Sequence, residues 1–404
     1  MNIESLHIFT QTPLVQTAVP AVVAMLLVFW IYFKVLKIAK DKNIVDLPKA
    51  RKFQFLPIPV LGGVAVFFGV VGGLLTACML FDCCVLLPVL LGMSIMVYIG
   101  AMDDIIGLTP VTRLVIEMLV ALCLIISTGY CVDSFHGLWG IHNFSWWYAI
   151  PLTIFACVGI INAMNMIDGV NGLSSGICLT CSALFGSVFL RCGDIPNAVL
   201  ALTMAAALFP FLLHNVFGDS SRMFIGDAGT MMMGVLMSWF TIRMLSASPS
   251  IDNPEMGNIA LVLAILAVPV FDALRVMTMR AVKGISPFRA DKTHLHHAFV
   301  KVGISHSITA LSEILLDLLI VLCWWLAYRL GASPDVQLYV VLIASIIFVW
   351  GNYFLLWLGT RDNAFAHRLQ RFAPKTHLGH TRWWIFFRDR LDCHEINNDK
   401  ISEV

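Results

Sequence analysis

The sequence predicts an all-α protein, a polytopic bundle of transmembrane helices. Of its 404 residues, 59% are hydrophobic and only 13% are charged, and the mean hydropathy is +0.85. A soluble domain typically carries about 25% charged residues. The apolar stretches are long enough to cross a bilayer, which takes about 20 helical residues. These stretches are continuous rather than alternating, which excludes a β-barrel, the other structure that satisfies the backbone inside a membrane.

About eleven spans are predicted, and they form one membrane domain over residues 1–358. The first lacks the basic start of a cleavable signal peptide and ends in a lysine-rich connection, as a start-transfer helix does. The segments near 113 and 229 contain polar interruptions, which leaves the count open by one. In order, the predicted spans are 14–36, 58–80, 84–101, 113–130, 146–165, 172–191, 196–216, 229–246, 258–278, 306–328 and 337–358.

The basic residues predict the orientation of the spans. Lys and Arg number seven in the connection 34–56, five in 279–305 and eight from residue 359 onward. With eleven spans these segments share one side of the membrane, whereas the connections on the other side hold almost no basic residues. Positively charged connections remain in the cytoplasm. The N-terminus is therefore expected outside and the C-terminus in the cytoplasm.

The last segment, residues 359–404, is expected to be a basic cytoplasmic or interfacial tail. Its arginines, with Trp383 and Trp384, suit a segment that lies on anionic lipid, and a partner-docking site is the alternative. The formal net charge of +1 gives no reason to expect nucleic acid as a partner. The adjacent Cys83 and Cys84 have no metal-ligand spacing and receive no role.

Four polar clusters stand out from the apolar background, and the predicted topology puts all of them on the cytoplasmic face. A lone aspartate at a helix boundary is often only a cap, but polar groups at membrane depth are costly and usually functional. Four clusters on one face therefore favour an active site. They are Asp103–Asp104 in AMDDIIGLTP; Asn162, Asn165, Asp168 and Asn171 in NAMNMIDGVNGL; Asp227 in FIGDAGT; and His294, His296 and His297 in PFRADKTHLHH.

The carboxylates and amides of these clusters suit a divalent cation. Asp103 and Asp104 repel each other unless a cation or a proton relieves them, although helix neighbours point about 100° apart and need not share a role. Carboxylate and amide oxygens are ligands for Mg²⁺, which commonly bridges protein oxygens and substrate phosphates. Asp227 lies between Gly226 and Gly229, where small residues let a phosphate or a metal approach the backbone.

The histidine segment admits three interpretations. Zinc is disfavoured because HLHH is too tight for a closed tetrahedral site and no cysteine lies near it. A solvated basic loop and a phosphate-binding loop remain, and Lys283, Arg289 and Lys292 favour phosphate. A metal site facing a basic loop suits the transfer of a phosphorylated group. No GxxxxGK[ST] sequence points to a P-loop.

At these motifs the sequence resembles the polyprenyl-phosphate N-acetylhexosamine-1-phosphate transferases, from about Asp46 to the end of the last span. Asp103–Asp104 matches that family's paired aspartates, NAMNMIDGVNGL its NxxNxxDGxDGL pattern, GDAGT its GDAG motif and SPFRADKTHLHH its histidine motif. The segment DLPKARKFQFLPIPVLGG is similar to the family's first cytoplasmic loop. The matching loop positions are Asp46, Pro48, Arg51, Lys52, Gly62 and Gly63.

The resemblance implies an enzyme in which a lipid phosphate attacks the β-phosphorus of a UDP-N-acetylhexosamine, giving a polyprenyl-diphosphate-sugar and UMP. Mg²⁺ or Mn²⁺ is the implied cofactor, with Asn165 and Asp227 as its ligands. The implied catalytic residues are Asp103, which activates or positions the lipid phosphate, and Asp104, which supports it. A prenyl phosphate is already largely ionised near neutral pH, which favours direct attack over a covalent intermediate. The resemblance assigns the uridine to Asp168 and Asn171, and the diphosphate or sugar to His294, His296 and His297.

Three positions depart from the family pattern. Asn171 replaces a common Asp, which keeps hydrogen-bonding capacity but removes a charge. Gln54 replaces a common His and receives no role. Arg113 replaces a common Lys, and it can bind the lipid phosphate or pair with Glu117 one helical turn later.

Within the family, the span count, the basic tail and the HLHH segment resemble the bacterial undecaprenyl-phosphate N-acetylglucosamine-1-phosphate transferases of the WecA type. This implies a multi-pass protein of the bacterial cytoplasmic membrane that uses undecaprenyl phosphate and UDP-GlcNAc to start a surface polysaccharide such as O-antigen. The alternatives are a phospho-MurNAc-pentapeptide transferase of the same family, a secondary transporter with an Asp/His relay, and a non-catalytic scaffold. The oligomeric state stays open.

Overall fold

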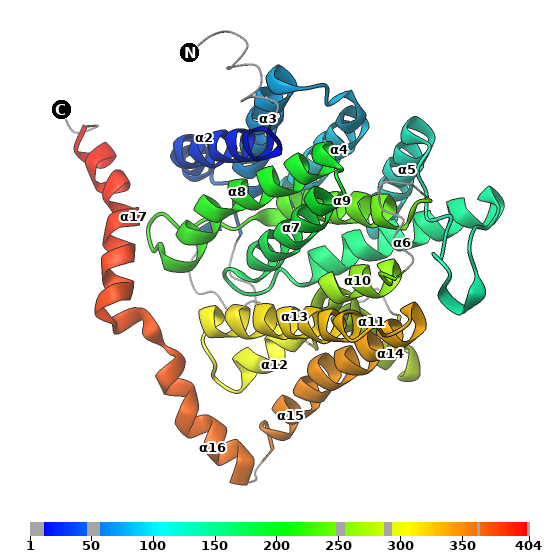
Figure 1. Ribbon diagram of the computed structural model, residues 1–404. Helices are drawn as coiled ribbons and strands as arrows, with labels where there is room; N and C mark the ends of the chain where they lie inside the picture. The colour runs from blue at the N-terminus through cyan, green and yellow to red at the C-terminus, as the bar shows by residue number, and fades with distance from the viewer. Residues whose placement is uncertain (1–11, 47–56, 248–254, 287–292, 362–363, 402–404) are drawn as a thin grey trace. The chain divides into compact units, whose positions relative to one another are not determined.

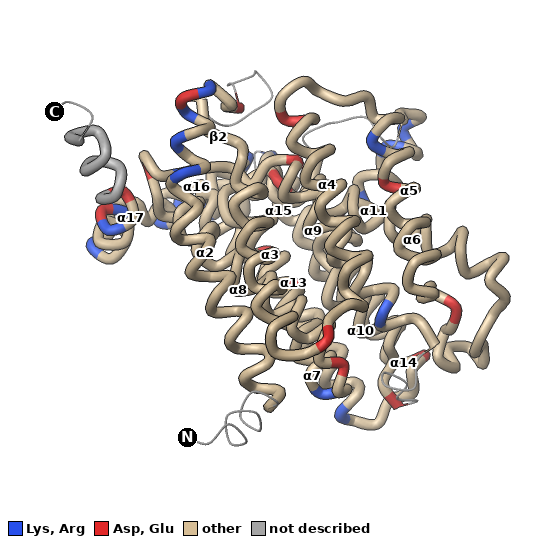
Figure 2. The backbone as a smooth tube through the Cα atoms, turned by 90° about the horizontal axis from the view of Figure 1, so that it is seen from above, with Lys and Arg blue, Asp and Glu red and all other residues tan. Residues whose placement is uncertain are grey.

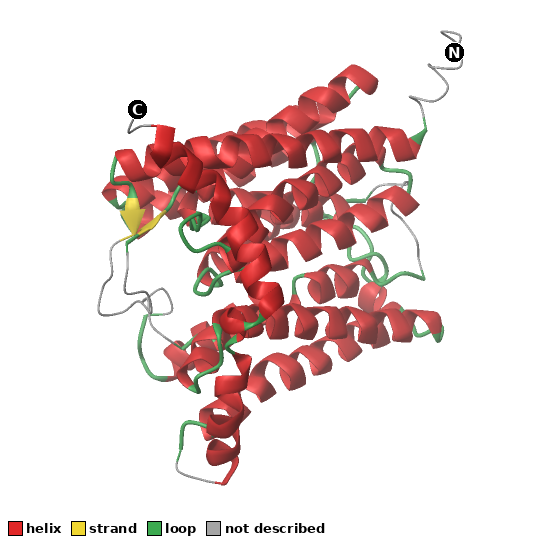
Figure 3. Cartoon of the chain, turned by 90° about the vertical axis from the view of Figure 1, so that its left-hand side faces the viewer, coloured by secondary structure: helices red, strands yellow, loops and turns green. Residues whose placement is uncertain are grey.

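The protein is almost entirely helical, as predicted. The computed structural model describes residues 12–46, 57–247, 255–286, 293–361 and 364–401, most of them in helices (Figure 3). Within these residues, ten helices are long and apolar enough to cross a membrane, and a bent helix pair makes up to eleven. The strands among them are β1 (Val45–Asp46) and β2 (Ile58–Pro59), which pair antiparallel. The prediction of a polytopic helical protein is therefore confirmed.

The chain divides into two compact units. Unit 1 contains Met1–Tyr130, Cys178–Phe240 and Thr381–Val404. In it, α2 packs against α3 and α8 (Figure 1), and Gly69 allows this approach because a Cβ there would meet Val28 of α2. The helices of unit 1 are α2 (Pro13–Asp41), α3 (Gly62–Leu80), α4 (Leu87–Ile106), α5 (Pro110–Thr128), α8 (Ile195–Phe217), α17 (Arg382–Ile401) and most of α7 (Leu173–Arg191) and α9 (Gly226–Leu245).

Unit 2 contains Cys131–Ile177 and Thr241–His380. In it, α13 packs against α10, α12 and α14, and α6 packs against α11. A span at Pro334–Leu358 runs through α14, a π-helical segment (Ile346–Gly351) and α15. The helices of unit 2 are α6 (Trp146–Met166), α10 (Asn258–Ile265), α11 (Ala267–Val282), α12 (Leu295–Lys301), α13 (His306–Arg329), α14 (Pro334–Ser345), α15 (Asn352–Leu358) and α16 (Ala364–Phe372).

The predicted span at 258–278 is broken. Its two halves, α10 and α11, meet at an angle of 80° around Leu266. Pro269 contributes to the break because it has no N–H to donate to the carbonyl of Ile265. Asp317, which is fully buried on α13, accepts a hydrogen bond of 3.0 Å from the backbone N–H of Val268. A side chain from another helix thus satisfies a backbone donor at the start of α11.

Most charged side chains avoid the middle of the long helices. Figure 2 shows Lys, Arg, Asp and Glu mainly toward helix ends and in the connections. The exceptions matter, because a buried charge needs a partner. Side chains at most 2% exposed include Glu117 in unit 1 and Asp272, Arg275, Glu313 and Asp317 in unit 2.

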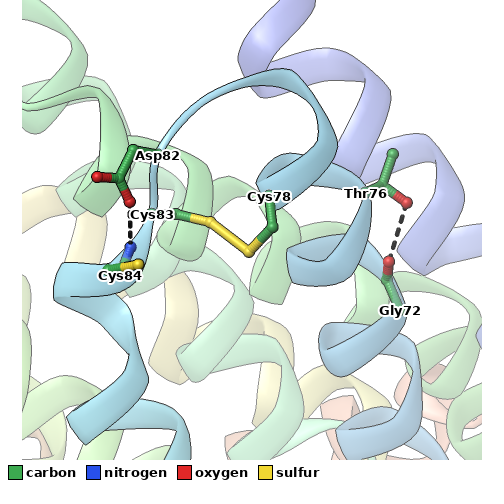
Figure 4. The surroundings of a disulfide bond; sticks show 6 residues. All are labelled: Gly72, Thr76, Cys78, Asp82, Cys83 and Cys84. Carbon is green, nitrogen blue, oxygen red and sulfur yellow. Dashed lines mark hydrogen bonds between the residues drawn. A yellow bond between two sulfur atoms is a disulfide. The ribbon is translucent and has the colours of Figure 1, made fainter.

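A disulfide joins Cys78, near the end of α3, to Cys83 in the turn that follows (Figure 4). In the same turn, a carboxylate oxygen of Asp82 accepts a 2.9 Å hydrogen bond from the backbone N–H of Cys84. Cys84 itself is a free, exposed cysteine. The sequence indicates no role for Cys83, whereas the structure gives it a covalent partner that closes the connection between α3 and α4.

Candidate active site

The paired aspartates lie in the last turn of α4 and face different partners. The helix ends at Gly107, whose φ of +72° favours glycine. One carboxylate oxygen of Asp103 accepts a 2.6 Å hydrogen bond from the N–H of Leu108. The other accepts one of 2.8 Å from Nη1 of Arg113, in the first turn of α5. Asp103 is thereby fixed at the point where α4 turns into α5.

Asp104 holds the start of α9. Its two carboxylate oxygens accept hydrogen bonds from the backbone N–H groups of Asp227 and Ala228, at 3.1 and 3.3 Å. A negative charge at a helix N-terminus is favourable, because the first N–H groups lack helical partners and carry partial positive charge. Asp104 is therefore placed to position Asp227.

Within unit 1, the GDAG segment packs closely against the end of α4 and the start of α3. Gly226 has a φ of +71°, and a Cβ there would meet the carboxylate of Asp104 at 2.5 Å. Gly62 and Gly63 donate backbone hydrogen bonds of 2.9 and 2.8 Å to the carbonyls of Phe224 and Ile225. The structure thus brings the two glycines of the first-loop motif to the GDAG segment.

Arg113 links the carboxylates of this group. Its Nη1 lies 2.8 Å from Asp103 and 3.9 Å from Asp227. A guanidinium between two carboxylates relieves the repulsion between Asp103 and Asp227. The Asp227 side chain is 34% exposed and that of Asp103 only 8%, so Asp227 is the more open of the two. We call Asp103, Asp104, Arg113 and Asp227 the carboxylate group.

The open carboxylate of Asp227 fits a magnesium ion. Mg²⁺ is usually held by one or two protein carboxylates, and waters and substrate phosphates complete its octahedral shell. In the described part of the chain, no three His, Cys, Asp or Glu side chains are arranged so that they could hold a metal ion among themselves. The open carboxylate of Asp227 suits an ion that is shared with a phosphorylated substrate, whereas a closed structural site needs four protein ligands.

In unit 2, the end of α6 carries the second predicted cluster. The amide of Asn162 donates a 2.9 Å hydrogen bond to the Val158 carbonyl of its own helix, and Asn165 lies in the last turn. Asp168 is exposed in the following turn and accepts a 2.6 Å hydrogen bond from Oγ of Ser174. Asn171 lies half-buried in the same connection. The carboxylate of Asp168 is thus held in place while it remains accessible.

The three histidines gather at the start of α12 and form the histidine group, His294, His296 and His297. The rings of His294 and His296 are parallel with centroids 5.7 Å apart, and the His297 ring lies 4.2 Å from that of His296. Burial lowers the pKa of His296 well below 6.5, and the neighbouring His297 and His294 lower it further. His296 is therefore neutral at pH 7.

The histidine group lies directly against the turn that carries Asp168. A Cβ at Gly169 would clash with the ring of His296, so only glycine fits there without displacement. Within the described residues, Nδ1 of the buried His296 has no hydrogen-bond partner. An orphaned polar atom of this kind fits a group that receives a ligand. Two of the four predicted clusters therefore meet within unit 2.

Sequence reasoning missed two residues that support the histidine group. Asp272 on α11 is 1% exposed and accepts a 2.8 Å hydrogen bond from Nδ1 of His294. Arg275, one turn later, donates to the same carboxylate at 2.7 Å. The available signal was an Asp and an Arg three positions apart inside an apolar span, where an unpaired charge is costly.

Each unit assembles part of the predicted site. The carboxylate group belongs to unit 1, and Asn165, Asp168, Asn171 and the histidine group belong to unit 2. Some predicted positions lie outside the described residues, namely Pro48, Arg51, Lys52 and Gln54 of the first loop and Arg289 and Lys292 of the histidine motif.

Comparison with known proteins identifies the family. The model of glycosyl transferase family 4 matches residues 86–245, which contain all the predicted site residues except the histidines. The probable undecaprenyl-phosphate N-acetylglucosaminyl 1-phosphate transferase of Bacillus subtilis is 30% identical over 74% of this chain and 81% of its own length. The undecaprenyl-phosphate α-N-acetylglucosaminyl 1-phosphate transferases of Escherichia coli K12 and Yersinia pestis are 29% and 27% identical, over 66% and 77% of this chain and 72% and 85% of their own lengths. The chain therefore belongs to glycosyl transferase family 4, together with these membrane transferases.

Proposed function

We propose that this protein transfers N-acetylglucosamine-1-phosphate from UDP-GlcNAc to undecaprenyl phosphate and releases UMP. The observation that carries the proposal is the similarity to the Bacillus subtilis transferase, of which the chain covers 81%. The carboxylate and histidine groups support it, because they supply anionic and imidazole groups suited to a metal–diphosphate substrate.

The reaction exchanges one phosphorus–oxygen bond for another. An oxygen of the lipid phosphate attacks the β-phosphorus of UDP-GlcNAc, and the bond from that phosphorus to the oxygen shared with UMP breaks. A prenyl phosphate is largely dianionic near pH 7 because its second pKa is about 6. The nucleophile thus needs positioning more than deprotonation. We assign that positioning to Asp103 and Arg113, with the guanidinium binding the lipid phosphate.

Mg²⁺, or Mn²⁺ in its place, would be held by Asp227 and Asn165 together with the diphosphate. When bound, the ion neutralises charge on the reacting phosphates. Asp104 keeps Asp227 in position through its hydrogen bonds to the start of α9. Asp168 and Asn171 are assigned to the uridine, and the histidine group to the diphosphate and sugar.

We further propose that the N-terminus is outside and the C-terminus in the cytoplasm of the bacterial inner membrane. The basic connections support this orientation. It puts the Cys78–Cys83 disulfide on the outer side, and disulfides persist in oxidising compartments. The catalytic domain is residues 1–358, with the tail on the membrane surface. In that tail, α17 exposes Trp383 and Phe386 near Arg388, a combination suited to a lipid interface.

The proposal is tested with purified protein, undecaprenyl phosphate, Mg²⁺ and radiolabelled UDP-GlcNAc, with UDP-GalNAc and UDP-MurNAc-pentapeptide as competing donors. We expect label in the lipid phase from UDP-GlcNAc, loss of transfer with EDTA, and loss of transfer in Asp227→Ala protein that still inserts. Near-normal activity of Asp227→Ala would contradict the metal assignment. No transfer from any donor, by protein shown to be folded, would contradict the proposed reaction.

A further inference from the structure

We propose that Asp272 is a positioning residue for the transfer reaction. It fixes the orientation and tautomer of His294 and supplies the counter-charge when His294 donates a hydrogen bond to the substrate diphosphate. This inference rests on the proposed function, and it concerns Asp272, which neither the motifs nor the family match includes.

The carboxylate of Asp272 connects α11 to the start of α12 in unit 2. Its Oδ2 lies 2.8 Å from Nδ1 of His294. Its Oδ1 accepts hydrogen bonds from Nη2 of Arg275 at 2.7 Å and from the backbone N–H of Leu295 at 3.1 Å. Because Leu295 begins α12, a single carboxylate holds both the first histidine ring and the start of the helix that carries the others.

The hydrogen bonds of Asp272 determine which nitrogen of His294 carries the proton. A carboxylate that faces a guanidinium and a backbone N–H acts as an acceptor. Nδ1 of His294 must therefore be the donor in their shared hydrogen bond. Nε2 is left as the nitrogen that can take up a proton and then donate to an anionic phosphate. The carboxylate behind the ring balances the positive charge that results, as it does in other Asp–His pairs.

Arg275 makes Asp272 a fixed group. The guanidinium carbon of Arg275 lies 3.6 Å from the ring centroid of Tyr353 on α15, a cation–π contact. Arg275 also donates to the carbonyl of Thr293, directly before His294. Asp272 and Arg275 are at most 2% exposed. A buried ion pair with all its hydrogen bonds made adds rigidity and specific geometry.

Asp272 and His294 lie close to the residues assigned to the substrate, which argues against a purely structural role for Asp272. The His294 ring lies parallel to that of His296, and His296 contacts the Gly169 turn next to Asp168. A change in the tautomer or tilt of His294 would therefore act at the diphosphate and sugar end of the site. At metal sites, changing a group that orients a ligating histidine typically lowers affinity or activity by about 10- to 100-fold, and we expect a loss of the same order here.

The test compares Asp272→Asn with wild type in the lipid-transfer assay. We expect kcat to fall by about 10- to 100-fold. The KM for undecaprenyl phosphate should stay within about twofold, because the histidine group is assigned to the other substrate. Asp272→Glu keeps the charge and the tautomer, so its kcat should lie clearly above that of the Asn variant. Asp317→Asn, a matched change at another buried carboxylate, should keep wild-type kcat.

A double-mutant cycle separates this role from general damage to the fold. If Asp272 acts through His294, then Asp272→Asn in a His294→Ala background should cause no further loss of kcat. Losses that multiply would overturn the proposal, as would an Asp272→Glu variant no better than Asp272→Asn. The thermal midpoint of each variant in detergent shows that folded protein is being compared. If Asp272→Asn does not purify as a folded protein, Asp272→Glu is compared instead with wild type and with His294→Ala. A kcat of Asp272→Glu as low as that of His294→Ala would overturn the proposal.

The result also distinguishes failure of this inference from failure of the proposed function. A wild-type protein that transfers no sugar phosphate would contradict the proposed function itself. An active wild type with an impaired His294→Ala variant and a fully active Asp272→Asn variant would contradict only the role of Asp272. A fully active His294→Ala variant would overturn the inference while leaving the transfer reaction intact.

Discussion

Asp103 and Asp104 are neighbours in the sequence, but they contact different parts of unit 1. Helix geometry turns successive side chains by about 100°. Asp103 therefore faces Arg113 and the turn after α4, whereas Asp104 faces the first N–H groups of α9. Helix geometry allowed this pair different roles, but the sequence did not require them. It could not identify the partners, because these belong to segments 10 and 123 residues away along the chain.

The assignment of Asp103 predicts a specific loss of activity. Asp103→Asn keeps an acceptor for the N–H of Leu108 but removes the charge opposite Arg113. We expect transfer to fall by about 100-fold or more, as for other groups that act on a reacting phosphate. Gln54→Ala, at a first-loop position with no assigned role, should stay near wild type. Equal effects of the two changes in the lipid-transfer assay would show that Asp103 has only a structural role.

Gly169 offers a test of the contact between two predicted motifs. In Gly169→Ala, the new methyl group would overlap the ring of His296, so the histidine group must shift. A small misplacement in a catalytic site can lower the rate by about 100-fold. Gly159→Ala is the control, because a Cβ at Gly159 meets nothing within 4 Å. We expect Gly159→Ala to keep the kcat of wild type and Gly169→Ala to have a far lower kcat. Equal rates for the two variants would contradict the contact between Gly169 and His296.

The buried His296 predicts a pH dependence of stability. Its pKa is lowered well below 6.5 in the folded protein, chiefly by burial. Below about pH 6.5 the unfolded chain therefore binds a proton at His296 that the folded protein does not bind. The contribution of the neutral His296 to the stability of the folded protein is thus fully present above about pH 6.5 and is lost as the pH falls.

For the one proton that His296 takes up on unfolding, the free energy of unfolding falls by up to about 1.4 kcal/mol for each pH unit below 6.5. Thermal midpoints between pH 7.5 and 5 should fall less steeply in His296→Gln than in wild type. His380→Gln, at an exposed position, should follow the wild-type curve. A His296→Gln curve parallel to wild type would contradict a neutral, buried His296.

The broken span formed by α10 and α11 depends on a side chain from a third helix. Asp317 of α13 supplies the acceptor for the N–H of Val268, and Pro269 removes a competing helical hydrogen bond. The sequence predicted the span but not the break. Segment 258–278 is apolar enough to be predicted as one span. The side chain that stabilises the break, Asp317, lies 49 positions from Val268 in the sequence.

Removing this acceptor should destabilise unit 2. Asp317→Ala leaves the Val268 N–H unsatisfied in a buried place, at a cost of about 1 to 3 kcal/mol. Asp317→Asn keeps a carbonyl oxygen that can accept the same hydrogen bond. A thermal-unfolding series in detergent should therefore rank wild type and Asp317→Asn together, with Asp317→Ala clearly lower. An Asp317→Ala variant as stable as wild type would mean that the break does not depend on this contact.

At the scale of the whole molecule, the sequence predicted the helical membrane fold and the positions of its spans, because hydropathy reports directly on the solvent around a helix. It did not predict contacts that depend on three-dimensional packing. Asp272 and Arg275 were missed inside an apolar span, and nothing in the sequence indicates that Cys78 pairs with Cys83. The motifs supplied the residues of the proposed site, and the structure added the groups that hold them.

The proposed orientation can be checked through Cys84. This exposed free cysteine follows the turn between α3 and α4, which is assigned to the outer side. A membrane-impermeant maleimide should label the protein in intact spheroplasts, and Cys84→Ser should abolish that label. Labelling of Cys84 only after the membrane is opened would reverse the topology and move the carboxylate group away from the cytoplasmic nucleotide sugar.

The most direct test of the central claim follows the β-phosphorus of the donor. Purified protein in lipid nanodiscs is given undecaprenyl phosphate, Mg²⁺ and UDP-GlcNAc labelled with ³²P at the β position. Transfer of a sugar phosphate predicts that the label enters the lipid phase while an equal amount of unlabelled UMP is released. Label that stays in the aqueous phase as UDP or free phosphate would contradict the account, because the phosphorus–oxygen bond to UMP would not have been the bond exchanged.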